Sequence, residues 1–303
     1  MIRPAKRSEA KPLIGLYAES GCGKTWSALL LARGYCGPSG KICMIETEGG
    51  RGEANVGRQP VGDYLVRPMR SDFSPQEYGK AIGEAEDEKV DVLIIDSASA
   101  EWEGTNGVLA QAADNQAAGK KGVLVWQQPK INHQRHFMLR LMQTPIPLVI
   151  VCMRAKYPME QVKGSEWTRS KTLEPKQADD ILFEMFVHGW IDAEHKLHVT
   201  KYTLPELANV VVDNEPVSIA TGQRLAAWAR GEPLPSSANN SGADQSDDLA
   251  AHDKALADAA EKGTAELQRV WKGIPREAQE TLEAAKDRRY KPRAMQVDAV
   301  NGP

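Results

Sequence analysis

The chain has 303 residues, of which 41% are hydrophobic and 26% are charged, and its formal net charge is −3. This is the composition of an ordinary globular protein, and the length suffices for one large core with a smaller appendage. The first residues lack the apolar core of a signal peptide, and the apolar run at residues 146–153 is too short to span a bilayer. The four cysteines show no metal-binding spacing. We therefore expect a cytoplasmic protein with no membrane partner.

The small net charge hides a strong segregation of charge along the chain. Residues 120–176 contain eleven Lys and Arg against three Glu, a net charge of +8, so the rest of the chain carries about −11. A local basic stretch in an acidic protein indicates a polyanionic partner better than the overall charge does.

Apolar runs and helical patterns alternate along the first half of the chain. Residues 74–89 are the clearest helix, because Ser74, Pro75 and Glu77 form a capping-box pattern at its start. The strands that we expect are residues 12–18, 41–48, 90–96 and 146–153, and the other helices are residues 25–35 and 129–143.

The second half of the chain adds a hairpin, a linker and a tail. Residues 181–190 and 195–203 alternate in polarity around a turn, as in a β-hairpin. Residues 231–248 are rich in Pro, Ser, Asn, Gly and Asp and indicate a flexible linker, while residues 249–303 are Ala-rich and indicate a small helical tail. The sequence therefore predicts an α/β core over residues 1–230, with a mostly parallel sheet flanked by helices and a C-terminal hairpin extension.

A phosphate-binding loop connects the first strand to the first helix. The sequence AESGCGKT matches the loop pattern, with Ala18 in place of the usual first glycine. Gly21 and Gly23 let successive backbone N–H groups converge on phosphate oxygens, and Lys24 can reach the outer phosphates. The residues expected to contact the nucleotide are Ala18, Glu19, Ser20, Gly21, Cys22, Gly23, Lys24, Thr25 and Trp26.

A magnesium site is expected beside this loop. Asp96 ends an apolar strand at its carboxyl tip, where ligands bind in open α/β sheets. The Thr25 hydroxyl can join the shell of a Mg²⁺ ion that accompanies ATP, and the Asp96 carboxylate suits a second-shell or water-mediated contact with the same ion.

The residue that activates water must lie elsewhere, because many P-loop hydrolases place a glutamate directly after this aspartate and Ser97 stands there instead. Glu46 and Glu48 lie one residue apart near the end of the second strand and are expected on the same side of it. Glu48 is our candidate general base, and Glu101 is the second choice.

Taken together, these motifs resemble a RecA-type ATPase, and more narrowly the short phage-encoded RecA-like AAA ATPases of single-strand annealing and recombination. The resemblance covers roughly residues 10–230. It implies that Arg154, at the end of the strand that follows Asp96, senses the γ-phosphate. It also implies that Lys201 reaches into the nucleotide site of a neighbouring subunit, although Thr203 stands where a second basic residue is usual.

A long basic segment follows Arg154. Six basic residues alternate with two aromatic residues between Arg154 and Lys176, an arrangement that suits single-stranded DNA because phosphates are neutralised while bases stack on rings. RecA-type proteins bind DNA through a loop at this point. The candidate DNA-binding residues are Lys156, Tyr157, Lys163, Trp167, Arg169 and Lys171.

The favoured function is thus an ATPase that uses ATP and Mg²⁺ and acts on single-stranded DNA as a homo-oligomer or filament. A single-strand DNA-binding protein is among the expected partners. Two alternatives stay open: a small-molecule P-loop kinase, and a DNA-binding assembly protein in which ATP is bound but not hydrolysed.

Overall fold

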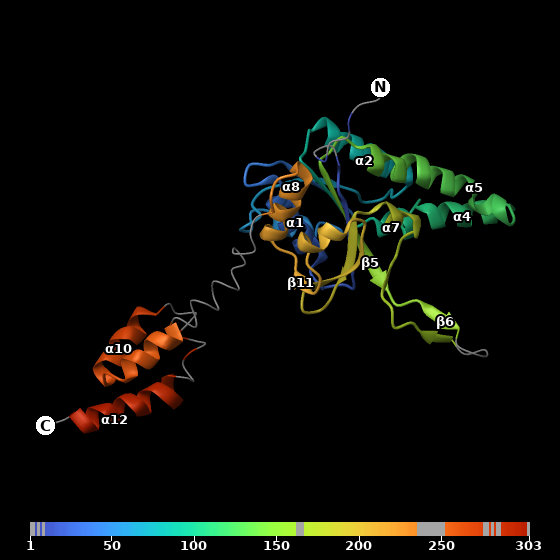
Figure 1. Ribbon diagram of the computed structural model, residues 1–303. Coiled ribbons are helices and arrows are strands. Elements are labelled where there is room, and N and C mark those ends of the chain that lie inside the picture. The colour runs from blue at the N-terminus through green and yellow to red at the C-terminus, as the bar shows by residue number, and fades with distance from the viewer. Residues whose placement is uncertain are drawn as a thin grey trace. The chain divides into compact units, whose positions relative to one another are not determined.

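The computed structural model divides into two compact units, Met1–Pro235 and Ser236–Pro303, and each is described here by itself (Figure 1). The residues that it describes are 4, 7, 10–161, 167–234, 252–274, 279, 282 and 286–301.

The first unit is built around a mostly parallel sheet. Its strands are β1 (Leu13–Ala18), β2 (Ile42–Glu46), β3 (Leu65–Pro68), β4 (Val92–Asp96), β5 (Leu148–Lys156), β8 (Glu174–Pro175), β9 (Val187–Ile191), β10 (Lys196–Tyr202) and β11 (Glu215–Pro216). The strand order is β11-β10-β9-β1-β5-β4-β2-β3, and β8 pairs with β5 outside this path. The pairs from β9 to β3 are parallel, whereas β10, β11 and β8 pair antiparallel.

The register of the parallel strands gathers chemically important residues at one edge of the sheet. Ala18 at the end of β1 pairs with Arg154 of β5. Glu46 at the end of β2 pairs with Asp96 at the end of β4. Because the carboxyl ends of parallel strands meet at the same edge, the phosphate loop, Asp96 and Arg154 lie together.

Helices cover both faces of this sheet. The helices on the first face are α1 (Lys24–Cys36) and α8 (Ile219–Arg230), and those on the second are α2 (Pro75–Asp87) and the continuous run of α5 (Val123–Asn132), η3 (His133–Met138) and α6 (Leu139–Gln143). The strands are apolar on both sides, so alternate residues enter different cores: Leu16 packs with α1 and Tyr17 packs with α2.

The backbones of α1 and α8 are in direct contact. A Cβ atom on Gly34 would lie 2.1 Å from the Ile219 carbonyl oxygen, and one on Gly222 would lie 2.2 Å from the Leu31 carbonyl oxygen. No side chain fits at either position, so glycine is required on both helices.

Two projections extend from the first unit (Figure 1). Helices α4 (Val108–Ala117) and α5 form a helical arm, and strands β6 (Met159–Gln161) and β7 (Trp167–Arg169) form a two-stranded hairpin beyond the end of β5.

The predicted fold class is confirmed: a mostly parallel sheet flanked by helices, with an antiparallel extension and a helical C-terminal part. The edge strand β3 was not predicted, because a four-residue strand containing Arg67 and ending at Pro68 has no apolar run. The capping box at Ser74 is half formed. Its hydroxyl accepts from the Glu77 N–H at 3.3 Å, but the Glu77 carboxylate pairs with Arg67.

The helix predicted over residues 129–143 begins earlier, at Val123, and passes through Pro129. Proline leaves the carbonyl four residues before it without its usual helical donor. Here the Asn115 side-chain amide, from α4, donates to that Val125 carbonyl at 2.9 Å. The helical arm therefore tolerates a proline that the sequence alone marks as a helix start.

Two further predictions were wrong in detail. The strand expected over residues 181–190 is shortened to β9, because Asp180–Glu184 forms the helix α7. The segment between Arg154 and Lys176, expected as an irregular loop, contains the β6–β7 hairpin and the short strand β8.

The second unit is helical and has its own core. Residues 252–260 are helical, followed by α10 (Thr264–Gly273), η6 (Lys286–Tyr290) and α12 (Lys291–Asn301). The core residues are Leu256, Ala259, Ala260, Leu267, Ile274, Leu282, Tyr290 and Ala294. Of the predicted linker, residues 235–248 lie outside the described residues. In the described ranges, every helix is too short or too polar to cross a membrane.

Candidate functional site

The phosphate loop has the backbone shape that its glycines predict. Gly21 and Gly23 adopt φ values of 90° and 86°, in the left-handed region that disfavours residues with side chains. The loop then enters α1 at Lys24, so that the backbone N–H groups of the first helical turn face the loop. His195 Nδ1, from the β9–β10 turn, lies 3.0 Å from the Cys22 carbonyl oxygen and braces the loop from outside.

The two residues predicted to hold magnesium are in direct contact. The Thr25 hydroxyl donates to Asp96 Oδ2 at 2.5 Å. Asp96 is 3% exposed, and burial raises its pKa, while the Thr25 hydrogen bond and the Lys24 charge oppose this rise. One carboxylate and one hydroxyl at a single point suit Mg²⁺, which keeps water and phosphate oxygens as its other ligands. The donor set therefore fits the ion.

A cavity of about 310 Å³ opens beside the loop. It brings together three predicted residues, Lys24, Glu48 and Arg154, although they come from three separate segments. Its lining residues are Ala18, Ser20, Lys24, Glu48, Arg51, Arg154, Ala155 and Lys176.

The cations across this cavity from the loop are held by carboxylates. Arg154 Nε lies 2.9 Å from Glu48 Oε1, and Arg51 lies 3.8 Å from Glu48 Oε2. Glu103 binds Lys176 at 3.3 Å and Arg154 at 4.0 Å. The hydrogen bond to Glu48 raises the pKa of Arg154. The cavity therefore holds its positive charges in place by ion pairs that a phosphate group could replace.

Of the three candidate acids, Glu48 is the one that lines this cavity, and its side chain is 18% exposed. Glu46 is fully buried. Its carboxylate accepts from the N–H groups of Glu48 at 2.7 Å and Gly50 at 3.0 Å and pairs with Arg70, so it shapes the turn after β2. That turn is why β2 ends at Glu46 rather than at the predicted residue 48.

Glu101, the second choice of base, is also fully buried and is engaged elsewhere. It lies 2.9 Å from His133 Nδ1 and accepts from the Gln177 amide at 3.2 Å. It does not line the cavity beside the loop as far as the described residues show.

Three other predicted residues have partners in their own chain. Lys201 donates to the carbonyl oxygens of Leu182 at 3.0 Å and Phe183 at 2.7 Å, at the end of α7. The Trp26 ring lies under the Arg58 guanidinium, 4.4 Å from the ring centroid. Glu19 forms an ion pair with Arg169 of the β6–β7 hairpin.

The predicted DNA-binding residues gather along the β6–β7 hairpin. The Arg169 guanidinium stacks on the Tyr157 ring at 4.5 Å and also lies 3.7 Å from Glu19 of the phosphate loop. Trp167 is 61% exposed. Lys156 and Lys171 flank the hairpin in exposed positions, and Lys163 lies outside the described residues.

Sequence reasoning missed Arg51, Glu103 and Lys176. The sequence does contain a signal for the Arg51–Glu48 ion pair, because Arg51 follows Glu48 by three residues. Lys176 returns to the cavity because its N–H donates to the Arg154 carbonyl at 2.7 Å, a pairing between residues far apart in the sequence.

No known protein-family profile matches the chain, and no curated protein sequence is similar to it. Among solved structures, an ATPase of the type III secretion system of pathogenic bacteria is 17% identical, with a TM-score of 0.35, over 60% of this chain and 51% of its own. The assembled ATPase EscN of enteropathogenic E. coli is 17% identical, with a TM-score of 0.36, over 81% and 54%.

A third structure, the flagellar accessory protein FlaH of Methanocaldococcus jannaschii, is 13% identical, with a TM-score of 0.33, over 63% of this chain and 78% of its own. The chain spans about half the length of the two secretion ATPases.

Proposed function

We propose that this protein is a RecA-like ATPase that acts on single-stranded DNA in phage-type recombination or annealing. The observation that carries this proposal is the nucleotide cavity, because the loop lysine Lys24 and the candidate base Glu48 both line it. The Thr25–Asp96 contact lies directly after the loop.

The loop and the cations of the cavity divide the work of binding a triphosphate. Backbone N–H groups and Lys24 bind the phosphates on one side. Thr25 and Asp96 would hold a Mg²⁺ ion, which would neutralise part of the phosphate charge. Arg154 and Lys176 line the same cavity, so this chain supplies cations to its own site. The neighbour's lysine predicted at Lys201 would add to these and would first have to leave the α7 carbonyls.

Glu48 is positioned to act as the general base. Arg154 and Arg51 each form an ion pair with one of its two carboxylate oxygens. A γ-phosphate competes for these guanidinium groups, and the released oxygen can accept a proton from the attacking water.

The hairpin is proposed as the DNA contact. Its exposed Trp167 offers a face for a base, and Lys156 and Lys171 offer charge to phosphates. The Arg169–Glu19 ion pair joins the base of the hairpin to the phosphate loop. DNA and nucleotide therefore bind to parts of the chain that touch each other.

Phosphate release with and without a single-stranded oligonucleotide tests this function. We expect DNA to stimulate the wild type. Glu48→Gln should still bind ATP but turn over on the order of 10²-fold or more slowly. Glu53→Gln, an exposed acid paired with Arg70 outside the cavity, is the matched control and should resemble the wild type.

Three results would redirect the proposal. Near-normal turnover of Glu48→Gln would remove Glu48 as the base. ATP binding without phosphate release by the wild type would support the non-hydrolysing assembly protein. For Lys201, a mixture of Lys24→Ala and Lys201→Ala subunits should recover activity at mixed interfaces, and no recovery would restrict Lys201 to its contacts with α7.

A further inference from the structure

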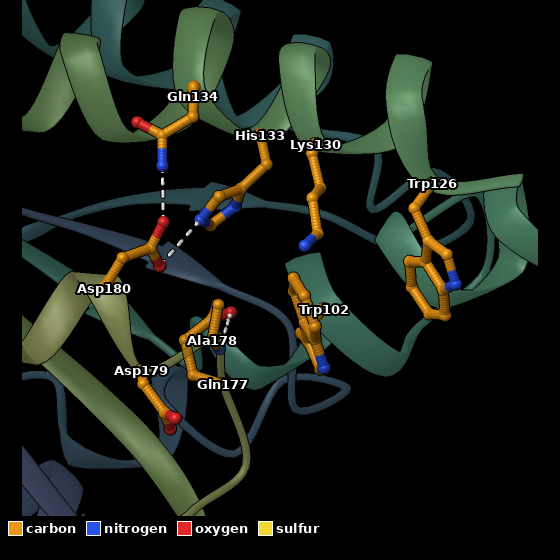
Figure 2. A pocket seen from close by; sticks show the side chains of 9 residues that line it. All are labelled: Trp102, Trp126, Lys130, His133, Gln134, Gln177, Ala178, Asp179 and Asp180. Carbon is orange, nitrogen blue, oxygen red and sulfur yellow. Dashed lines mark hydrogen bonds and ion pairs between the residues drawn. The ribbon is translucent and has the colours of Figure 1, made fainter. Parts of the chain in front are cut away.

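A second, larger cavity is lined in part by His133 and Gln177, the two partners of Glu101. It encloses about 580 Å³ between the helix α3 (Ser99–Glu103), the α5–η3 helix and residues 177–180. It shares no lining residue with the nucleotide cavity. Its lining residues are Trp102, Trp126, Lys130, His133, Gln134, Gln177, Ala178, Asp179 and Asp180 (Figure 2).

The floor of this cavity is built from buried charged groups. His133 is 2% exposed and lies between Glu101, at 2.9 Å, and Asp180, at 3.3 Å. The Trp102 ring packs edge-on against the His133 ring, with centroids 5.7 Å apart and planes at 74°. This contact with His133 holds the Trp102 indole in position.

The α5–η3 helix and residues 177–180 lie on opposite sides of the cavity, and each side offers a charged group. Figure 2 shows the side chains of Trp126, Lys130 and His133 pointing from the α5–η3 helix toward Trp102 and residues 177–180. Trp126 is 37% exposed. Neither the Lys130 ammonium nor the Asp179 carboxylate has a hydrogen bond or ion pair to another described residue. A cavity with aromatic faces and a few converging polar groups is the usual form of a ligand site.

We propose that this cavity binds one nucleotide unit. The base stacks on the indoles of Trp102 and Trp126, the Lys130 ammonium binds the adjoining phosphate, and the Asp179 carboxylate accepts an N–H of an exocyclic amino group. These three roles use each group that the cavity leaves free.

The surrounding charge favours an anionic chain over an isolated base. From Lys120 to Gln143 the sequence contains five Lys and Arg and no Asp or Glu. The same chemistry could come from a nucleic-acid strand or from a free nucleotide. The strand form of the proposal rests on the proposed function, because it adds a second DNA contact to the hairpin, whereas the free-nucleotide form does not.

Equilibrium binding of a fluorescently labelled oligodeoxycytidylate to the full chain, at low salt and without ATP, tests the site. Trp126→Ala should weaken binding roughly 5- to 150-fold, the effect of one stacked base. Lys130→Gln should lower the salt dependence by about one phosphate contact. The matched controls are Val123→Ala, an 81% exposed residue on the same helix, and Lys121→Gln, neither of which lines the cavity.

A competition arm with dCMP distinguishes the two sources. If dCMP displaces the oligonucleotide only weakly, the site takes a strand. If the wild type binds dCMP but no oligonucleotide, and Trp126→Ala loses dCMP, the cavity is a free-nucleotide site and the proposed DNA function fails. Asp179→Asn should weaken deoxycytidylate more than thymidylate, which has no exocyclic amino group.

A third arm uses the hairpin variant Trp167→Ala. If both cavity variants bind DNA like the wild type while Trp167→Ala binds weakly, the cavity proposal is overturned and the proposed function stands. Unchanged binding of every ligand in Trp126→Ala and Lys130→Gln also overturns it. Circular dichroism of each variant confirms that the chain is folded, and Lys130→Gln keeps the test valid if Trp126→Ala unfolds.

Discussion

The two cavities are organised in opposite ways. In the nucleotide cavity, Arg51, Arg154 and Lys176 each meet a carboxylate. In the second cavity, called the tryptophan cavity after Trp102 and Trp126, Lys130 and Asp179 meet no charged partner among the described residues, and the two indoles form part of the lining. Paired charges suit a ligand that brings several charges and can exchange partners with them. Free charges beside aromatic faces suit a ligand that brings one charge and a flat ring.

Among the variants that test the difference between the two cavities, Lys24→Ala is expected to have the largest effect. It removes the ammonium that reaches the outer phosphates, so Mg-ATP binding should be lost while the fold is kept. DNA binding measured without ATP should not change. Calorimetric titration with Mg-ATP measures the loss, with Lys80→Ala, an exposed lysine of α2, as the control. Unchanged ATP affinity in Lys24→Ala would contradict the assignment of the loop.

The second effect concerns the floor of the tryptophan cavity. Burial opposes the charge of His133, but hydrogen bonds to Asp180 and Glu101 outweigh it and raise the pKa of His133 to about 9. The pKa of His133 in the folded protein lies above the ordinary value of 6.5. The charged His133 therefore stabilises the fold fully below pH 6.5, and this stabilisation is lost as the pH rises through 9. The contribution of His133 to the free energy of unfolding is on the order of 3 kcal/mol, which is the pKa shift multiplied by the free energy of one pKa unit.

Urea unfolding at pH 6, 8 and 10 measures this dependence. His133→Gln, which keeps a side-chain donor, should be less stable at pH 6 and should lose the fall between pH 6 and pH 10. A wild type whose free energy of unfolding is flat over this range would show that His133 is neutral, and the cavity floor would then carry an unpaired buried carboxylate.

A third test compares the hairpin with both cavities. Trp167→Ala should weaken single-strand binding by roughly 1–3 kcal/mol if a base stacks on this ring. ATP affinity should be unaffected, since Trp167 does not line the nucleotide cavity. Phe183→Ala, another exposed aromatic residue, is the control in the same fluorescence titration. Equal losses in the two variants would argue against a specific stacking site on the hairpin.

The smallest expected effect comes from Glu103→Gln. Glu103 holds both Lys176 and Arg154, and removing its charge leaves these cations more available to phosphate. Because partly exposed ion pairs contribute little, ATP should bind only about two- to fivefold more tightly. Weaker binding in Glu103→Gln would mean that the carboxylate orients the cations rather than competing for them.

The sequence predicted the features that depend on neighbouring residues. The phosphate loop is such a feature, because its glycines, Lys24 and Thr25 are contiguous and lie between a strand and a helix. Asp96 is another, because an apolar run ending in an acid marks the tip of a buried strand. For the same reason the strands β1, β2, β4 and β5 were placed to within a few residues.

The features that the sequence did not predict depend on contacts between distant segments. Pro129 lies inside a helix because Asn115, from another helix, satisfies the carbonyl that proline leaves without a donor. Glu101 resembled a loop acid near Asp96, but it is buried beneath its partners His133 and Gln177. No local pattern reports such pairings.

The contact between α1 and α8 limits how the first unit can respond to nucleotide. Because Gly34 and Gly222 bring the two backbones together with no side chain between them, these helices cannot slide past each other without collision. The buried Arg33 guanidinium fixes α1 further through the Val61 carbonyl. The helix that follows the glycine-rich loop is thus held rigidly against α8, and the two helices can move only together.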